Sequence, residues 1–303
     1  MMDIEPLEID WDYVVERLDR ILDLGEECLT RRLVEYQFDP AIFRDYIAFR
    51  WIQHQENGYL AEVAYPNLVN HDDLFGIDRI LETLRRNTAQ FVQRYPANNV
   101  LLWGEGGSGK SSAIKGLLNP FFQDGLRLIE VHKEDLFQLP QITSLLREQS
   151  HRFILFCDDL SFGEQDPGYR ELKALLDGGI EEPSENILFY ATSNRRHLLP
   201  EHFSDNLDGQ EISPEEALAG KRSLADCFGI SLGFYPMSQQ VYLEIIHYLA
   251  QQRRLIIDSK ELNRAALSWS KERDSRSGRV AKQFISDLSG RMAMAGKIAP
   301  LSP

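Results

Sequence analysis

The feature that most constrains the fold of this chain is a glycine-rich segment at residues 104–111, which reads Gly-Glu-Gly-Gly-Ser-Gly-Lys-Ser. It matches the pattern G-x-x-x-x-G-K-[ST], follows the apolar run 100–103 and precedes a helical pattern at 113–118. Such glycines let the backbone turn tightly and direct successive N–H groups at phosphate oxygens, and the following helix adds its positive end. A glycine-rich turn before an ordinary helix is the alternative, but the flanking patterns favour a phosphate-binding loop.

The loop predicts a set of nucleotide-binding residues. At this spacing Lys110 reaches the β- and γ-phosphates, and the Ser111 hydroxyl binds Mg²⁺. We therefore expect ATP and Mg²⁺ as ligands. The expected nucleotide-binding residues are Gly104, Glu105, Gly106, Gly107, Ser108, Gly109, Lys110, Ser111 and Ser112.

A second motif places two acidic residues after an apolar run. Residues 153–157 are followed by Asp158 and Asp159. Ligands bind at the carboxyl ends of strands in open α/β sheets, and buried strands seldom end in two acids without a cation nearby. We predict that Asp158 holds Mg²⁺ through water and that Asp159 polarises the attacking water. An ordinary strand followed by an Asp turn is the alternative.

A third apolar run, 187–191, ends in Thr192, Ser193 and Asn194. If this strand neighbours the one before Asp158, Asn194 can orient the attacking water or the γ-phosphate. The alternative is a polar strand end with a turn.

The middle of the chain predicts a doubly wound α/β fold with a parallel sheet. Between residues 71 and 236, short apolar runs at 100–103, 127–131, 153–157 and 187–192 alternate with helical patterns that include 110–118 and 169–176. Short apolar runs are typical of buried parallel strands. The polar, acidic stretch from 201 to 220 is expected to be a long surface loop.

Helices are expected on both sides of this core. Residues 1–70 are expected to form a mostly helical N-terminal region, with one helical pattern near 14–22 and a second apolar set from Phe38 to Trp51. After Pro236 the strand patterns stop. Residues 237–303 then predict a helical lid, with helices from a Ser238 cap, over about 260–270, and over 278–294.

The last helical pattern begins near Arg279, where a lid helix can place a guanidinium on bound phosphates. Arg276 is the rival for this role, and an ordinary surface arginine is the alternative.

Charge and composition limit the classes of partner that are expected for this chain. The net charge of −14 argues against broad nonspecific binding to nucleic acid. Residues 251–303 nevertheless hold eleven Lys/Arg and five Asp/Glu, a charge of +6, so this region can contact phosphates, whether of a nucleotide or of DNA, or be an ordinary solvated helical surface. No apolar stretch approaches the roughly 20 residues of a membrane span. The odd number of scattered cysteines favours a reducing cytoplasm.

Taken together, these motifs resemble the AAA+ ATPases, and more closely the bacterial AAA+ family catalogued as domain of unknown function 815. Residues 73–78 resemble the element that lines the adenine pocket in that superfamily. The resemblance implies an ATPase that acts as a homo-oligomeric ring of six subunits on a protein partner that the sequence does not identify. The matching segments are 48–51, 98–104, 153–161, 191–198, 234–236 and 276–281.

One position departs from the superfamily pattern. Related proteins carry an arginine before Phe-Gly that reaches the γ-phosphate of the adjacent subunit, and here that position is Cys227. Such arginines are worth about 10³–10⁵ in rate. Three explanations stay open: Arg195, Arg196 or Arg222 substitutes, the ring turns over slowly, or the protein is an ATP-gated switch. A P-loop small-molecule kinase is a further alternative, which the Asn-bearing strand and the helical lid disfavour.

Overall fold

The computed structural model describes residues 13, 15, 17–24, 38–54, 57–162, 167–178, 184–196, 198, 224 and 226–295. The chain divides into two compact units, Met1–Pro40 and Ala41–Pro303. In the first unit residues 17–24 are helical, as the sequence predicted, and the Arg17 guanidinium lies 5.8 Å from the centroid of the Tyr13 ring. The predicted loop at 201–220 and Arg222 lie outside the described residues.

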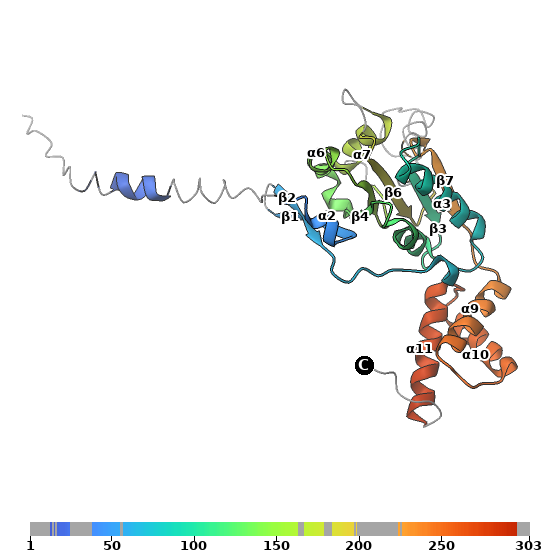
Figure 1. Cartoon of the computed structure of the whole chain (residues 1–303). Helices are drawn as coiled ribbons and strands as arrows, with labels where there is room; N and C mark the ends of the chain where they lie inside the picture. Colours follow the sequence, from blue (N-terminus) through green and yellow to red (C-terminus); the bar gives the residue numbers. More distant parts are fainter. Residues whose placement is uncertain are drawn as a thin grey trace, which may run out of the picture. The chain divides into compact units, whose positions relative to one another are not determined.

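The described part of the second unit contains a seven-stranded sheet in the order β2-β1-β4-β5-β6-β3-β7 (Figure 1). All neighbouring strands are parallel except β2, which runs antiparallel to β1. The four predicted strands, β3 to β6, are all present, and β5 and β6 are buried along their whole lengths. The strand bounds are β1 Ala48–His54, β2 Asn57–Glu62, β3 Val100–Gly104, β4 Leu126–Glu130, β5 Arg152–Cys157, β6 Ile187–Ser193 and β7 Ile230–Phe234.

Helices connect the strands and cover the sheet. Alternate side chains of the central strands, such as Val100 with Leu102 and Ile154 with Phe156, share one buried cluster with Leu84 of α3. This alternation places one side of each strand against α3, α4 and α5. The helix bounds are α2 Ile42–Asp45, α3 Asp78–Val92, α4 Lys110–Lys115, α5 Leu118–Phe121, α6 Leu139–Arg147 and α7 Pro167–Asp177, with 3₁₀ turns η1 at His71–Asp73 and η2 at Lys133–Gln138.

The helix predicted for the second apolar set, 38–51, is wrong for most of that segment. Only α2 is helical there, and β1 with its hairpin partner β2 joins the edge of the sheet. The apolar positions also fit a period of two, and pairing of Ala48 with Leu128 on β4 decides between the two periods. Trp51 is fully buried and donates a 2.6 Å hydrogen bond from its indole to Gln138 Oε1. Residues 48–54 and 57–62 are therefore part of the sheet and not of an N-terminal helical region.

The three predicted C-terminal helices are confirmed as α9 (Gln239–Gln252), α10 (Ser259–Glu272) and α11 (Gly278–Met294). Ser238 and Ser277 cap α9 and α11 by accepting hydrogen bonds from Val241 N and Val280 N. The three helices bury their own apolar cluster, with Tyr242 and Phe284 at its centre. This lid is therefore a separately packed layer that joins the sheet through the β7–α9 connection.

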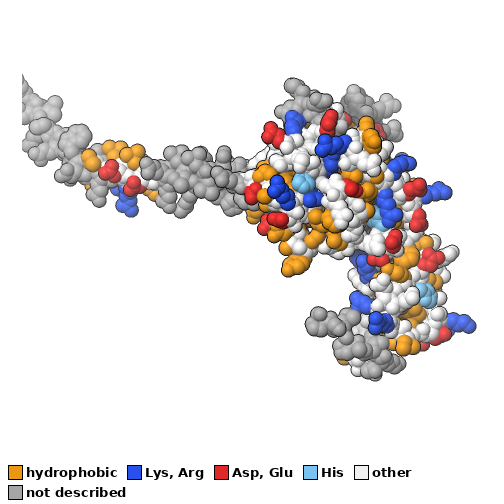
Figure 2. Space-filling model, viewed as in Figure 1, with side chains coloured by type: hydrophobic (Ala, Val, Ile, Leu, Met, Phe, Trp, Pro, Cys, Tyr) orange, Lys and Arg blue, Asp and Glu red, His pale blue; other side chains and the backbone are white. Residues whose placement is uncertain are grey.

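Within the described residues, no helix is long and apolar enough to cross a membrane. On the face drawn in Figure 2, lysine and arginine side chains lie among aspartates and glutamates over both the sheet and the lid.

Candidate nucleotide site

The glycine-rich loop, residues 104–109, leaves the carboxyl end of β3 and enters α4. Gly104, Gly107 and Gly109 have φ angles of 134°, 77° and 103°, which favour glycine. A Cβ at Gly104 would lie 2.0 Å from the carbonyl oxygen of Phe234 on β7. The glycines therefore serve the loop conformation, as the motif predicted, and Gly104 also provides space beside β7, which the motif did not predict.

Lys110 is the centre of the site. Its side chain is 6% exposed, and Nζ donates to the carbonyl oxygens of Gly104 (2.7 Å) and Glu105 (2.8 Å) and to Asn194 Oδ1 (3.2 Å). Burial lowers the pKa of Lys110, while the charges of Asp158 and Asp159 act in the opposite direction. Because all three hydrogen-bond acceptors are neutral, phosphate oxygens would be stronger partners for this ammonium group.

Asp158 follows β5 and faces the first turn of α4. Its Oδ1 accepts hydrogen bonds from Ser111 Oγ (2.6 Å) and Thr192 Oγ1 (2.5 Å). Carboxylate and hydroxyl oxygens are the ligands that Mg²⁺ prefers, so this donor set fits the ion. The described residues contain no group of three or more His, Cys, Asp or Glu that could hold a metal ion. The sequence had not singled out Thr192, although its place two residues before Asn194 was a signal.

Asn194 joins the lysine to the second aspartate. Its Nδ2 donates a 2.6 Å hydrogen bond to Asp159 Oδ1, and its Oδ1 accepts from Lys110. Asp159 has a φ of 55°, and its backbone N–H donates to Thr192 Oγ1 at 2.9 Å. The ends of β3, β5 and β6 thus bring the predicted lysine, aspartates and asparagine into one hydrogen-bonded group.

The lid contacts the loop through the start of α11. A Cβ built on Gly107 would lie 3.1 Å from both Arg279 Cβ and Ser277 Oγ. The positive charge of Arg279 also contributes to the lowered pKa of Lys110. Arg279 therefore lies close enough to Lys110 for its charge to act on it, whereas Arg276 lines the cavity beside the loop.

A cavity of about 260 Å³ lies beside the loop, between the sheet and the lid. Phe75 and Ile77, from the segment expected to line an adenine pocket, face it together with Tyr235 and Val241. Its lining also includes Glu105, Ser108, Arg276 and Ser277. A mostly apolar slot with polar groups at the loop end can take a flat base whose phosphates point toward Lys110.

Comparison with known protein families shows which family this chain belongs to. The model of the family described as "Protein of unknown function (DUF815)" matches residues 44–292. The chain belongs to this family. No curated protein matches it.

Solved structures place this DUF815 protein among AAA+ folds. RuvB, the Holliday junction branch migration motor of Thermotoga maritima, aligns with 16% identity over 77% of this chain and 68% of its own, at a TM-score of 0.54. A variant of that motor aligns with 15% identity over 75% and 66% of the two chains, at a TM-score of 0.52. The fold is therefore the AAA+ P-loop fold with C-terminal helices, as predicted.

The position that departs from the AAA+ pattern holds a neutral group. Burial and a hydrogen bond to Asp177 raise the pKa of the Cys227 thiol to about 12. Of the three arginines that were considered as substitutes, Arg195 and Arg196 are exposed at the end of β6. The Arg196 guanidinium lies 5.3 Å from the centroid of the Trp103 ring.

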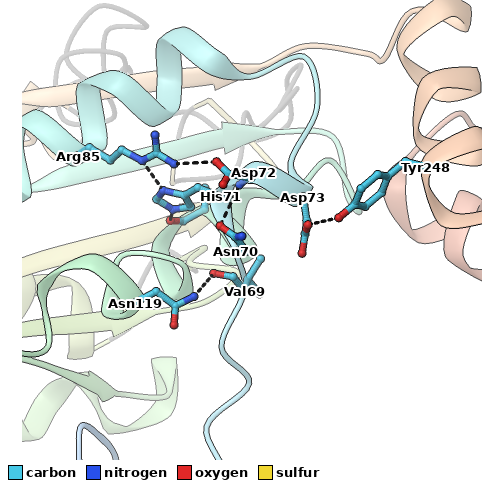
Figure 3. A network of polar contacts seen from close by, with 9 residues as sticks. Val69, Asn70, His71, Asp72, Asp73, Arg85, Asn119 and Tyr248 are labelled. Carbon is cyan, nitrogen blue, oxygen red and sulfur yellow. Dashed lines mark hydrogen bonds and ion pairs between the residues drawn. The ribbon is translucent and has the colours of Figure 1, made fainter. Parts of the chain in front are cut away.

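A network of hydrogen bonds links α4, the helix that follows the glycine-rich loop, to the lid (Figure 3). His71 Nε2 donates to the carbonyl oxygen of Ala113 on α4 (2.8 Å), while His71 Nδ1 accepts from Arg85 Nε on α3 (2.9 Å). Two residues on, Asp73 accepts a hydrogen bond from Tyr248 of α9. The η1 turn therefore touches the loop helix, α3 and the lid at once, a connection that the sequence did not predict.

Proposed function

We propose that this protein binds Mg-ATP at the glycine-rich loop and hydrolyses it. The observation that carries the proposal is the hydrogen-bonded group in which Asn194 joins Lys110 to Asp159, next to the Ser111–Asp158 pair. The cavity beside the loop supports an adenine nucleotide over a bare phosphate.

In this proposal each residue has a separate task. The loop amides and Lys110 hold the triphosphate, exchanging the carbonyl partners of Nζ for phosphate oxygens. Ser111 and Asp158 hold Mg²⁺, which when bound neutralises charge on the phosphate oxygens. Asp159 accepts the proton of the attacking water, and Asn194 positions that water. These roles need no large rearrangement, because the side chains already lie within hydrogen-bond distance of one another.

The lid couples nucleotide state to movement. Only ATP offers Arg279 a γ-phosphate, so the ATP and ADP states differ in how strongly they hold α11 against the loop. In our proposal a homo-oligomeric ring, of six subunits, transmits this movement to a protein partner, with nucleic acid contacted through the basic C-terminal region as the other candidate.

An ATP-gated switch with little hydrolysis is the second candidate function. The neutral Cys227 favours it, because a thiol cannot stabilise the charge that develops on the γ-phosphate. If Arg195, Arg196 or Arg222 of a neighbouring subunit supplies the compensating positive charge, hydrolysis is the expected function.

A product assay over a range of protein concentrations separates these functions. Free phosphate released from Mg-ATP, at a rate per subunit that rises steeply with concentration, is expected for a ring ATPase with a site completed between subunits. Tight ATP binding with negligible turnover at every concentration would favour the switch. A phosphorylated small molecule in place of free phosphate would identify a kinase and overturn the proposal.

A further inference from the structure

Part of the apolar wall of the cavity beside the glycine-rich loop comes from one short stretch of chain. Residues 69–77 lead through the η1 turn to the start of α3, and Phe75, Gly76 and Ile77 among them line that cavity. We name residues 69–77 the wall segment. The contacts that hold this segment decide where its apolar side chains lie relative to the loop.

The first residues of the wall segment are fixed to the helices that follow the loop (Figure 3). His71 Nε2 donates a 2.8 Å hydrogen bond to the carbonyl oxygen of Ala113 on α4. A Cβ built on Gly116, the C-cap of α4, would lie 2.3 Å from His71 Cδ2, so the imidazole lies directly against the helix. Asn119 of α5 donates to the carbonyl oxygen of Val69 at 2.9 Å. This end of the wall segment is therefore held in place relative to the loop.

The other end of the wall segment contacts the lid helix α9. The Tyr248 hydroxyl donates to Asp73, and the ring centroids of Tyr248 and Phe75 are 5.0 Å apart. Two turns earlier on the same face of α9, Val241 meets Gly76, where a Cβ would lie 2.9 Å from Val241 Cγ1. Tyr248 itself does not line the cavity. It therefore contacts the wall segment without contacting the space that a nucleotide would occupy.

The Tyr248 hydroxyl is oriented by two hydrogen bonds. Gln252, one turn later on α9, donates from Nε2 to the Tyr248 oxygen at 2.7 Å, which leaves the hydroxyl proton for Asp73. The hydrogen bond to Asp73 is also the main cause of a raised pKa of Tyr248, so the phenol remains a donor at neutral pH. Hydrogen bonds to an ionised carboxylate are stronger than those between neutral groups, and this one joins α9 to the wall segment.

We propose that Tyr248 is a positioning residue for the base of the bound nucleotide. Its ring and its hydrogen bond to Asp73 hold Phe75 at the cavity, while the His71 contact holds the same segment against α4. The base then meets a wall whose position relative to the loop is already set, so less conformational freedom is lost on binding. Because Tyr248 belongs to the lid, recognition of the base depends on the contact between the lid and the wall segment.

The inference rests on the proposed binding of an adenine nucleotide at the loop, but not on hydrolysis, so its test uses two ligands that the proposed reaction does not consume. ADP and pyrophosphate share the diphosphate and differ in the nucleoside. Calorimetric titration of the full chain gives the affinity for ADP, and displacement of ADP gives the affinity for pyrophosphate at the same site. The ratio of the two affinities measures the contribution of the nucleoside.

Tyr248→Ala should lower this ratio about tenfold, because Phe75 loses its support. The affinity for pyrophosphate should stay within about twofold of wild type, since the loop amides and Lys110 remain. Tyr95→Ala removes an exposed tyrosine outside this network and is the matched control, which should leave both affinities unchanged. Melting temperatures show whether each variant keeps its fold.

Further variants test the hydrogen bond apart from the ring contact. Tyr248→Phe keeps the ring, so it should lower the ratio only about threefold, and Asp73→Ala should do the same. The two substitutions together should lower the ratio no further than either alone, because both remove one hydrogen bond. Asp73→Asn keeps an oxygen that accepts from Tyr248 and should stay close to wild type. Additive losses in the double variant would overturn the assigned route through Asp73.

An equal fall of both affinities in Tyr248→Ala would overturn the inference, because a residue that only stabilises the fold would weaken pyrophosphate binding as much as ADP binding. If wild type binds ADP and the ratio is unchanged in Tyr248→Ala, the inference fails while the proposed function stands. If wild type binds neither ligand, the proposed nucleotide site fails and the inference fails with it.

Discussion

Ser111 Oγ donates a 2.6 Å hydrogen bond to Asp158 Oδ1, which joins the first turn of α4 to the end of β5. The two residues lie 47 positions apart in the chain, and their oxygens meet where the loop would hold the metal of a bound nucleotide. The pair therefore carries the metal-binding half of the proposed site.

The first prediction concerns this pair. Ser111→Ala removes the hydroxyl ligand. The factor by which Mg²⁺ strengthens ATP binding should therefore fall about tenfold or more. Ser111→Thr keeps the hydroxyl and should behave as wild type. ATP titrations with and without Mg²⁺ measure the difference. The metal role of Ser111 would be lost if the alanine variant kept the full Mg²⁺ effect.

The second prediction concerns Asn194, which joins Lys110 to Asp159. Asn194→Ala should lower kcat by about 10²-fold, because the base and the attacking water lose their common anchor. The affinity for ATP should change much less, since the loop amides and Lys110 remain. Phosphate release and nucleotide titration on the same preparation separate the two effects. A variant that lost ATP affinity while keeping kcat would show that Asn194 serves ATP binding and does not position the attacking water.

The third prediction separates the two lid arginines. Arg279 lies against Gly107, whereas Arg276 lines the cavity beside the loop. Arg279→Ala should therefore lower the ratio of ATP affinity to ADP affinity about tenfold, because the contact to the γ-phosphate is lost. Arg276→Ala, as the matched control, should weaken both nucleotides alike. Competition titrations with ATP and ADP measure the preference, and the opposite pattern would make Arg276 the γ-phosphate contact.

The fourth prediction concerns pH and His71. Burial and the nearby Arg85 guanidinium lower the pKa of His71, whose Nδ1 already accepts a hydrogen bond from Arg85. Below a pH of about 6.5 the unfolded chain takes up a proton that folded His71 does not, so the free energy of unfolding should fall as pH falls. This loss should end once the pH passes below the lowered pKa of the folded state.

Replacing the ring tests that account. His71→Gln keeps an N–H donor and an acceptor but does not titrate, so its unfolding free energy should fall less between pH 7.5 and 5.5 than that of wild type. Burial also lowers the pKa of His151, so part of the pH dependence should remain. Urea unfolding at the two pH values measures it. Identical pH dependence in the variant and wild type would show that His71 is not the titrating group.

The order of motifs made most of the candidate nucleotide site predictable as a cluster of side chains. Parallel strands deliver their carboxyl ends to one edge, so Asp158 and Asn194 were expected near Lys110 from chain order alone. The glycine spacing predicted a loop, and the structure adds that Gly104 is also needed for its close approach to β7.

Other features depend on tertiary partners and were not predictable. The apolar positions around Phe49 and Trp51 fit a helix and a strand equally well, and β4 decides between them. Thr192 gains its role only because β6 lies beside β5, so its hydroxyl reaches Asp158.

Phosphate release from Mg-ATP by wild type and Asp159→Asn, with ATP affinity measured on the same samples, decides whether this protein hydrolyses ATP with Asp159 as the base. The variant should bind ATP within a few-fold of wild type and release phosphate about 10²-fold or more slowly, because the amide cannot accept the proton of the attacking water. Equal rates of phosphate release in the two proteins, or no release above background by wild type at any protein concentration, would contradict the proposed mechanism.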